Sequence, residues 1–152
     1  YVARQVLDEG DLMILDGDLV ISNPEVLHTE FDRSGYSAIW TEEHTDEWLM
    51  QVDADGRVIE CSRDGGEKGW ILFSISRWSK EDAKKLKKYL EYEFDHAGNR
   101  YLYWDDVPMT RHLDRFDLGI TPMKRGDVVE IDSFDELKEY DSSYKDYKAL
   151  SN

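Results

Sequence analysis

The sequence has few of the features that mark secreted or membrane proteins. It contains one cysteine among 152 residues, so no internal disulfide can form, as is usual for proteins of a reducing compartment. No apolar run approaches the roughly 20 residues of a transmembrane helix. The first residues lack the apolar core and the small-residue cleavage site of a signal peptide. We therefore expect a cytoplasmic protein that does not contact a membrane.

Basic residues are also scarce. Lys and Arg total 19 against 34 Asp and Glu, which gives a formal net charge of −15. A protein that binds a nucleic-acid backbone needs clustered cations to displace its counterions, so this balance argues against nucleic acid as a partner. It also disfavours adsorption to an anionic membrane surface. Aromatic residues make up 12% of the chain and hydrophobic residues 40%, which indicates a folded domain rather than a disordered acidic chain.

The pattern of the chain predicts one α/β domain over residues 1–140 and a polar tail over residues 141–152. Apolar or alternating runs predict strands at residues 12–15, 36–40, 47–52, 57–60, 70–75, 116–120 and 128–131. The first of these is a continuous apolar run between charged turns, which is typical of a strand buried on both faces of a sheet. The sequence Asp-Ala-Asp-Gly at residues 53–56 contains two possible metal ligands, but its flanks alternate as strands, so it predicts a hairpin turn.

Helices are fewer and have clearer boundaries. Ser79 is a predicted N-cap, and the residues after it carry an apolar stripe at helical spacing as far as Phe94. Ser133 and Glu136 match a capping box, which predicts a second helix to about Tyr140. Residues 105–113 predict a weaker helix, and residues 1–7 resemble the last turns of another, with two valines on one face.

Acidic residues stand at two predicted strand ends, where ligands of open α/β sheets gather. Asp16-Gly17-Asp18 follows the strand at residues 12–15, and its two carboxylates suit a hard divalent cation. Glu130 and Asp132 are spaced so that both side chains can point to one side of a strand end. An ordinary Asp-Gly turn and solvated capping carboxylates are the alternatives at these two places.

Other catalytic patterns are missing. The four histidines show no spacing typical of metal ligands, and no Ser-His-Asp or Cys-His arrangement is apparent. The chain has no Gly-rich phosphate-binding loop.

Aromatic residues next to carboxylates form a second candidate site. Trp48 follows Asp46 and Glu47, and Tyr103 stands two positions before Asp105. An aromatic face beside a negative charge is what a quaternary ammonium ligand needs, because cation–π attraction and the neighbouring charge both favour it. Packing in the hydrophobic core is the alternative for each of these aromatic residues.

Several segments together resemble a known family. The segments Leu12–Val20, Thr45–Leu49, Ser76–Trp78, Leu102–Asp106 and Glu130–Leu137 are similar, in order and spacing, to segments of the bacterial CTP:phosphocholine cytidylyltransferases and sugar-phosphate nucleotidyltransferases. The resemblance implies a Rossmann-like fold, a mixed sheet flanked by helices. It implies an enzyme that transfers CMP, or another NMP, from a nucleoside triphosphate to phosphocholine or a sugar phosphate and releases pyrophosphate. In the choline-activating members this reaction serves the decoration of cell-surface polysaccharide.

The resemblance also implies roles for single residues. Asp18, Glu130 and Asp132 match the ligands of a catalytic Mg²⁺, and Asp18 and Asp132 would be the catalytic pair. Trp48 and Tyr103 match the walls of the choline pocket. Their neighbours Glu47 and Asp105 would supply the negative charge of that pocket.

One part of the family pattern is missing from this sequence. The family's opening Gly-rich segment, which contains an Arg and binds the nucleotide phosphates, has no counterpart here. We therefore expect the chain to form only the C-terminal portion of the fold, to be inactive alone, and to leave a sheet edge unpaired through which it could self-associate. Two other functions stay open: a non-catalytic acidic module that binds choline-like or sugar ligands through Trp48 and Tyr103, and an interaction fragment with a solvated acidic face.

Overall fold

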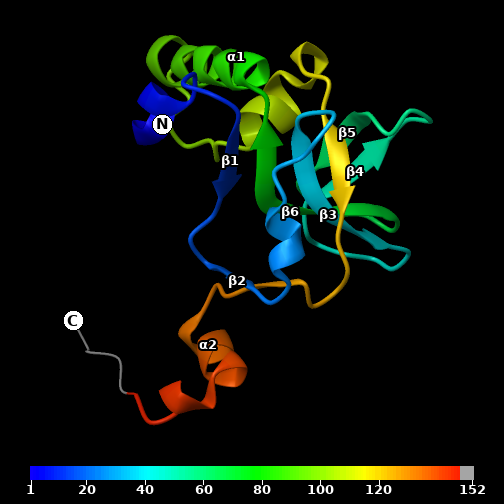
Figure 1. Cartoon of the computed structure of the whole chain (residues 1–152), viewed down its shortest axis with the longest axis vertical. Coiled ribbons are helices and arrows are strands. Elements are labelled where there is room, and N and C mark those ends of the chain that lie inside the picture. Colours follow the sequence, from blue (N-terminus) through cyan, green and yellow to red (C-terminus); the bar gives the residue numbers. More distant parts are fainter. Residues whose placement is uncertain (148–152) are drawn as a thin grey trace.

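The computed structural model describes residues 1–147 and consists of two sheets and two regular helices (Figure 1). The strands are β1 (Leu12–Leu15), β2 (Leu19–Ile21), β3 (Gly35–Thr41), β4 (Leu49–Val52), β5 (Val58–Ser62), β6 (Gly69–Trp78), β7 (Gly119–Pro122) and β8 (Val128–Glu130). The helices are α1 (Lys80–Glu91) and α2 (Phe134–Tyr140). Short 3-10 or π-helical turns cover Val2–Val6, Pro24–Leu27, Tyr92–His96, Val107–Arg111, Leu113–Arg115 and Ser142–Tyr144.

The main sheet has six strands around the long strand β6. Its order is β5-β4-β6-β3-β7, and β1 also pairs with β6. Strand β1 pairs with the second half of β6 and β4 with its first half, while β3 runs along nearly the whole strand. All these pairs are antiparallel except β3 with β7, which is parallel. The predicted mixed sheet flanked by helices is thereby confirmed.

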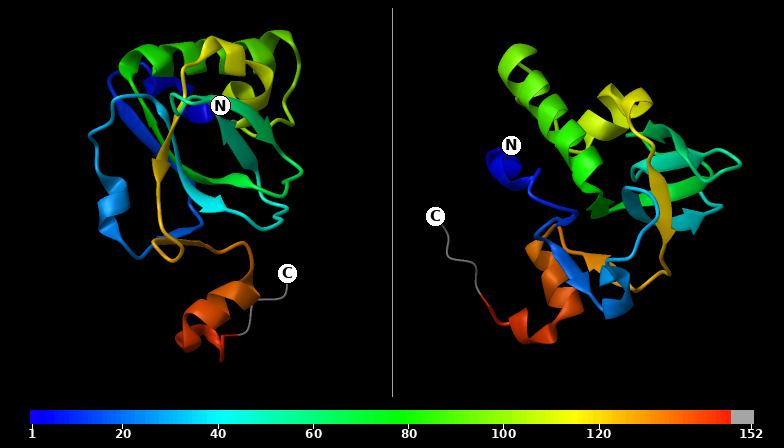
Figure 2. Two further views of the ribbon diagram at one scale, coloured as in Figure 1. Left: turned by 90° about the vertical axis from the view of Figure 1, so that its right-hand side faces the viewer. Right: turned by 45° about the horizontal axis from the view of Figure 1, so that its top comes forward.

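Helix α1 covers one face of the main sheet and forms the core with it (Figure 2). Ser79 caps the helix by accepting a hydrogen bond from the Asp82 N–H. The predicted apolar stripe is buried at Ala83, Leu86 and Leu90, where it packs into a cluster with aromatic residues of β3 and β6. Full burial of such side chains stabilises the fold by about 1.5–3 kcal/mol for each leucine.

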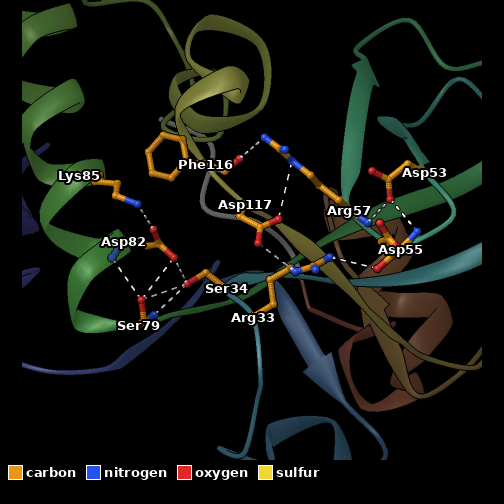
Figure 3. Close-up of polar contacts among 10 residues, drawn as sticks. All are labelled: Arg33, Ser34, Asp53, Asp55, Arg57, Ser79, Asp82, Lys85, Phe116 and Asp117. Atoms are coloured by element: carbon orange, nitrogen blue, oxygen red, sulfur yellow. Dashed lines mark hydrogen bonds and ion pairs between the residues drawn. The ribbon is translucent and has the colours of Figure 1, made fainter.

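A partly buried polar network connects the start of β3 to the start of α1 (Figure 3). The Ser34 hydroxyl donates to Asp82 Oδ2 at 2.7 Å and accepts from the Ser79 N–H at 3.0 Å. Lys85 Nζ pairs with Asp82 Oδ1 at 2.8 Å. These bonds lower the pKa of Asp82, although burial alone would raise it. The network therefore fixes the first turn of α1 against the start of β3.

The second sheet is small and lies at the opposite end of the molecule from α1, next to α2 (Figures 1 and 2). It consists of β2 and β8, paired antiparallel with Leu19 opposite Glu130. Residues from the beginning and the end of the chain thus meet here. The predicted capping box of α2 is present, because Ser133 and Glu136 each accept a hydrogen bond from the other's backbone N–H.

The structure corrects several expectations about β1 and the N-terminus. Strand β1 pairs only with β6, and its side chains are half-buried or, at Leu15, 38% exposed, so it is not buried on both faces. Its other edge has no partner strand among residues 1–147. Residues 2–6 form a 3-10 turn in which Val2 and Val6 are both exposed, so they do not form the expected apolar face. The core contact here comes instead from Leu7.

Other differences concern boundaries. The strand expected at 116–120 begins at Gly119, because residues 113–115 form a 3-10 turn that Phe116 caps, and Phe116 is buried in the core. The weak helix expected at 105–113 is a short π-helical turn followed by a 3-10 turn. The predicted polar tail begins with another 3-10 turn, and residues 148–152 lie outside the described part of the chain. Within residues 1–147, every helix falls short of the length and apolar character that crossing a bilayer requires.

Candidate active site

Three carboxylates from distant parts of the sequence meet beside the small sheet. Asp18 precedes β2, Glu130 ends β8, and Asp132 follows it. One carboxylate oxygen from each side chain lies within 4.8 Å of the other two. The pairing of β2 with β8 brings them together, and the Ile131 N–H extends it by donating to the Asp18 carbonyl at 3.0 Å. We call Asp18, Glu130 and Asp132 the carboxylate cluster.

Partial burial, together with the neighbouring charges, raises the pKa of one member of the carboxylate cluster. The Glu130 side chain reaches solvent but also lies against the protein, and this partial burial is the main reason why its pKa rises to about 7. The neighbouring Asp132 and Asp18 raise it further. Hard cations such as Mg²⁺ and Ca²⁺ prefer oxygen ligands of this kind. The cluster could therefore hold such a cation, which would relieve the repulsion between its members.

The capping box of α2 fixes the position of Asp132. Glu136 Oε2 accepts hydrogen bonds from the backbone N–H groups of Asp132, at 2.7 Å, and Ser133, at 2.9 Å. Asp132 therefore leaves β8 in a defined direction, immediately before the helix begins. The capping box is a helix signal in the sequence, and in the structure it also orients a candidate metal ligand.

A pocket of about 300 Å³ adjoins the carboxylate cluster and contains all the residues predicted for the site. Its lining comes from β6 and the end of β8, from the segments next to β1, β4 and β8, and from the loop before residue 107: Asp16, Asp18, Glu47, Trp48, Leu72, Ser74, Tyr103, Asp105, Glu130 and Asp132. No lysine or arginine lines it among residues 1–147. Six of the ten lining residues are acidic, so the pocket favours a cationic ligand.

Trp48 and Tyr103 form one side of this pocket, which we call the aromatic wall. Their ring centroids are 6.4 Å apart and the ring planes meet at 80°, an edge-to-face arrangement. Tyr103 is 65% exposed, which excludes packing in the core for this residue. Trp48 is half-buried and touches the edge of the core. By contrast, Trp78 is fully buried and belongs to the core.

Asp105 lies beside the aromatic wall and is only 7% exposed. Its Oδ1 accepts a hydrogen bond from the Tyr36 hydroxyl at 2.7 Å, whereas no hydrogen bond to Oδ2 is found within residues 1–147. Burial raises the pKa of Asp105 to about 7; the Tyr36 bond opposes the rise, and the nearby Asp16 and Asp106 add to it. A cationic ligand would stabilise the ionised form of this carboxyl.

The sequence patterns do not predict some residues in and around the pocket. Leu72 and Ser74 line the pocket from β6, and their spacing of two along a predicted strand could have placed them on one face. Tyr36 was recognised only as part of a strand, because nothing in the sequence links its hydroxyl to a carboxyl 69 positions away. The turn at residues 53–56 is a hairpin turn as predicted, with Gly56 at φ +75° and Asp53 bonded to Arg57.

The chain is similar to known cytidylyltransferases, although no family model matches it. It is 31% identical over 144 residues to a 2-aminoethylphosphonate cytidylyltransferase of Lancefieldella rimae, a match that covers 95% of this chain and 58% of that protein. It is 22% identical over 145 residues to the choline-phosphate cytidylyltransferase of Streptococcus pneumoniae, covering 95% of this chain and 61% of that protein. The chain thus spans about 60% of the length of the curated relatives it matches.

The solved structures show the same relationship at the level of the fold. The CTP:phosphocholine cytidylyltransferase of Streptococcus pneumoniae superimposes with a TM-score of 0.77 at 21% identity, over 94% of this chain and 62% of that one. The inositol-1-phosphate CTP transferase of T. maritima superimposes with a TM-score of 0.56 at 12% identity, over 98% of this chain and 62% of that one. The resemblance inferred from the sequence is confirmed. The chain has the fold of the nucleotidyltransferases, and the homologues that it matches are cytidylyltransferases.

Proposed function

We propose that this chain forms the metal-binding and acceptor-binding part of a nucleotidyltransferase. The whole enzyme would transfer CMP from CTP to a phosphorylated or phosphonylated acceptor that carries a cationic amine, and would release pyrophosphate. One observation carries this proposal: the carboxylate cluster and the aromatic wall lie in the same pocket, which no basic residue of the described chain lines. The names of the relatives support the reaction, because both act on small amine-bearing phosphoryl or phosphonyl compounds.

The carboxylate cluster would hold a Mg²⁺ ion. All three side chains offer hard oxygen donors, which fits the ligand preference of this ion. When bound, the ion would supply positive charge that stabilises the transferring phosphoryl group. The capping box fixes the backbone of Asp132 beside the cluster. Asp18 faces it across the small sheet, so both ends of the chain contribute to the cluster.

The aromatic wall and Asp105 would orient the acceptor. Its cationic amine would lie against Trp48 and Tyr103, with Asp105 and Glu47 supplying negative charge. The acceptor's phosphate or phosphonate group would then point toward the carboxylate cluster at the other side of the pocket. An oxygen of that group attacks the α-phosphorus of CTP, a new P–O bond forms, and the bond to pyrophosphate breaks. The residues of this chain contribute by holding the attacking oxygen in place.

Acceptor binding tests this proposal on the 152-residue chain itself. We would titrate phosphocholine, 2-aminoethylphosphonate and glucose 1-phosphate into the chain by calorimetry, with and without Mg²⁺, and repeat the titrations with Asp18→Asn. We expect a cationic acceptor to bind more tightly with Mg²⁺ and to lose that gain in the variant. Equal binding with and without Mg²⁺ would favour a non-catalytic binding module instead. If glucose 1-phosphate binds most tightly, the acceptor is a sugar phosphate and not a compound with a cationic amine.

A further inference from the structure

A positively charged residue supports the aromatic wall. Arg63 follows β5 and is not among the residues that line the pocket. Its guanidinium carbon lies 5.1 Å from the ring centroid of Trp48 and 5.5 Å from that of Tyr103. Both distances are within the range of cation–π attraction. One side chain therefore contacts both members of the wall from a position outside the pocket.

The charge of Arg63 is balanced by a buried carboxylate. Arg63 Nη1 lies 3.2 Å from Oδ1 of Asp106, whose side chain is 1% exposed. The other oxygen of Asp106 accepts a hydrogen bond from the Tyr103 backbone N–H at 3.0 Å. Asp106 thus holds the guanidinium and the backbone of Tyr103 at the same time. Because the pair is close to neutral as a unit, it leaves the pocket side of both rings attractive to a second cation.

The two rings need such support because they come from separate segments. Trp48 directly precedes β4, whereas Tyr103 lies in the loop before the turn at Val107–Arg111 and is largely exposed. Few packing contacts hold an exposed loop tyrosine in one orientation. The guanidinium is planar and can stack on aromatic faces, which a lysine ammonium does with less directional preference. Arg63 has the chemistry and the position to set the angle between the rings.

We propose that Arg63 is a positioning residue of the acceptor pocket, acting through Trp48 and Tyr103 without touching the acceptor. This inference rests on the proposed function, since it concerns the affinity for the cationic acceptor. Acceptor binding and metal binding should respond differently to Arg63. The aromatic wall depends on Arg63, whereas the carboxylate cluster is built on β2 and β8 and does not depend on it. Loss of the guanidinium therefore lowers the affinity for the acceptor and leaves the affinity for the metal unchanged.

The test compares Arg63→Met with Arg63→Lys and a matched control, Arg57→Met. Arg57 is equally exposed, at 43% against 45% for Arg63, and pairs with Asp117 outside the pocket. For each variant we would measure the Kd of phosphocholine and 2-aminoethylphosphonate with Mg²⁺ present, the Kd of Mg²⁺ alone, and the urea midpoint of unfolding. We expect Arg63→Met to weaken the acceptor roughly threefold to tenfold, with Mg²⁺ unaffected. Arg63→Lys should recover part of the loss, because it keeps a cation near the rings.

The possible outcomes separate this inference from the proposed function. If the unmodified chain binds neither acceptor, the proposed function fails and the role of Arg63 falls with it. If the unmodified chain binds and Arg63→Met behaves like Arg57→Met, only the role of Arg63 is refuted. Equal losses of acceptor and Mg²⁺ affinity with a lower urea midpoint would show a general structural role and overturn the inference. Tighter acceptor binding by Arg63→Met would show that the guanidinium competes with the ligand, which also overturns it.

Discussion

Replacing Asp132 by Asn is the most direct perturbation of the carboxylate cluster. The substitution removes one negative charge and keeps the size of the side chain. It also keeps the backbone N–H that donates to Glu136, so the capping box of α2 stays intact. The variant should therefore fold normally and differ from the original chain mainly in its affinity for a divalent cation.

The structure sets the expected magnitude. Three oxygens up to 4.8 Å apart leave a central point no more than about 2.8 Å from each, so a small adjustment reaches the 2.0–2.1 Å that Mg²⁺ requires. Two opposite unit charges 4 Å apart attract each other by about 1 kcal/mol in water and by about 4 kcal/mol near a protein surface. Because all three carboxylates are exposed, we expect a loss of about 1–3 kcal/mol. This corresponds to a roughly fivefold to 150-fold higher Kd for the cation.

Calorimetric titration of Mg²⁺ measures this loss, and the rise of the thermal midpoint with added Mg²⁺ provides an independent readout. Asp55→Asn is the matched control, since it removes the same charge from the exposed hairpin turn, whose residues are outside the candidate metal cluster. The control should bind Mg²⁺ as the original chain does. If Asp132→Asn and Asp55→Asn bind Mg²⁺ equally well, the cluster is not a cation site.

Four further predictions concern single side chains. Trp48→Leu should raise the Kd of phosphocholine roughly threefold to thirtyfold in calorimetry, and should leave the Kd of an isosteric neutral tert-butyl analogue unchanged; equal losses would remove cation–π attraction as the cause. The pKa of Asp105 is about 7 in the folded chain against about 4 when unfolded, so the native state holds its proton more tightly and this residue costs increasing stability as the pH rises from 4 to 7. Asp105→Asn should therefore gain stability relative to the original chain between pH 5 and pH 8 in urea titrations, and a pH-independent difference would contradict this. Ser34→Ala removes the buried hydroxyl that bonds Asp82 and should lower the free energy of unfolding by about 1–2 kcal/mol, with acceptor binding unchanged. Cys61, whose thiol pKa is raised to about 12 chiefly by burial, should react slowly with iodoacetamide at pH 8 until the chain is unfolded, and fast labelling of the folded chain would refute this.

The parts of the fold that the sequence predicted are those that local patterns determine. Helix α1 follows from the Ser79 cap and the apolar spacing after it, and α2 from its capping box. Strand β2 was not predicted, because it has only three residues and its partner β8 lies more than 100 positions away. The apolar run of β1 predicted a strand correctly but overestimated its burial, since such a run does not reveal how many neighbours the strand has.

The candidate site shows the same limit. Asp18, Glu130 and Asp132 were recognisable as acidic residues at strand ends, and the structure brings them together. Arg63 could not be recognised, because its contacts with Trp48, Tyr103 and Asp106 join segments that no local pattern connects. Side chains that act on the site from outside the pocket are defined by tertiary packing alone.

The position of the carboxylate cluster on the small sheet has a consequence for folding. Asp18 and Asp132 are 114 positions apart, so pairing β2 with β8 closes a very long loop. The strands pair over three residues each, and Leu19, Ile21 and Val128 pack against side chains of the main sheet. This packing surface exists only after the main sheet has formed, so the entropy cost of closing the loop is offset late, and the small sheet forms late in folding. Mutual repulsion of the three carboxylates opposes the pairing further. A bound cation would replace that repulsion by attraction and would hold the two strands together. Amide hydrogen exchange in β2 and β8 would then slow, while exchange in the main sheet would stay the same.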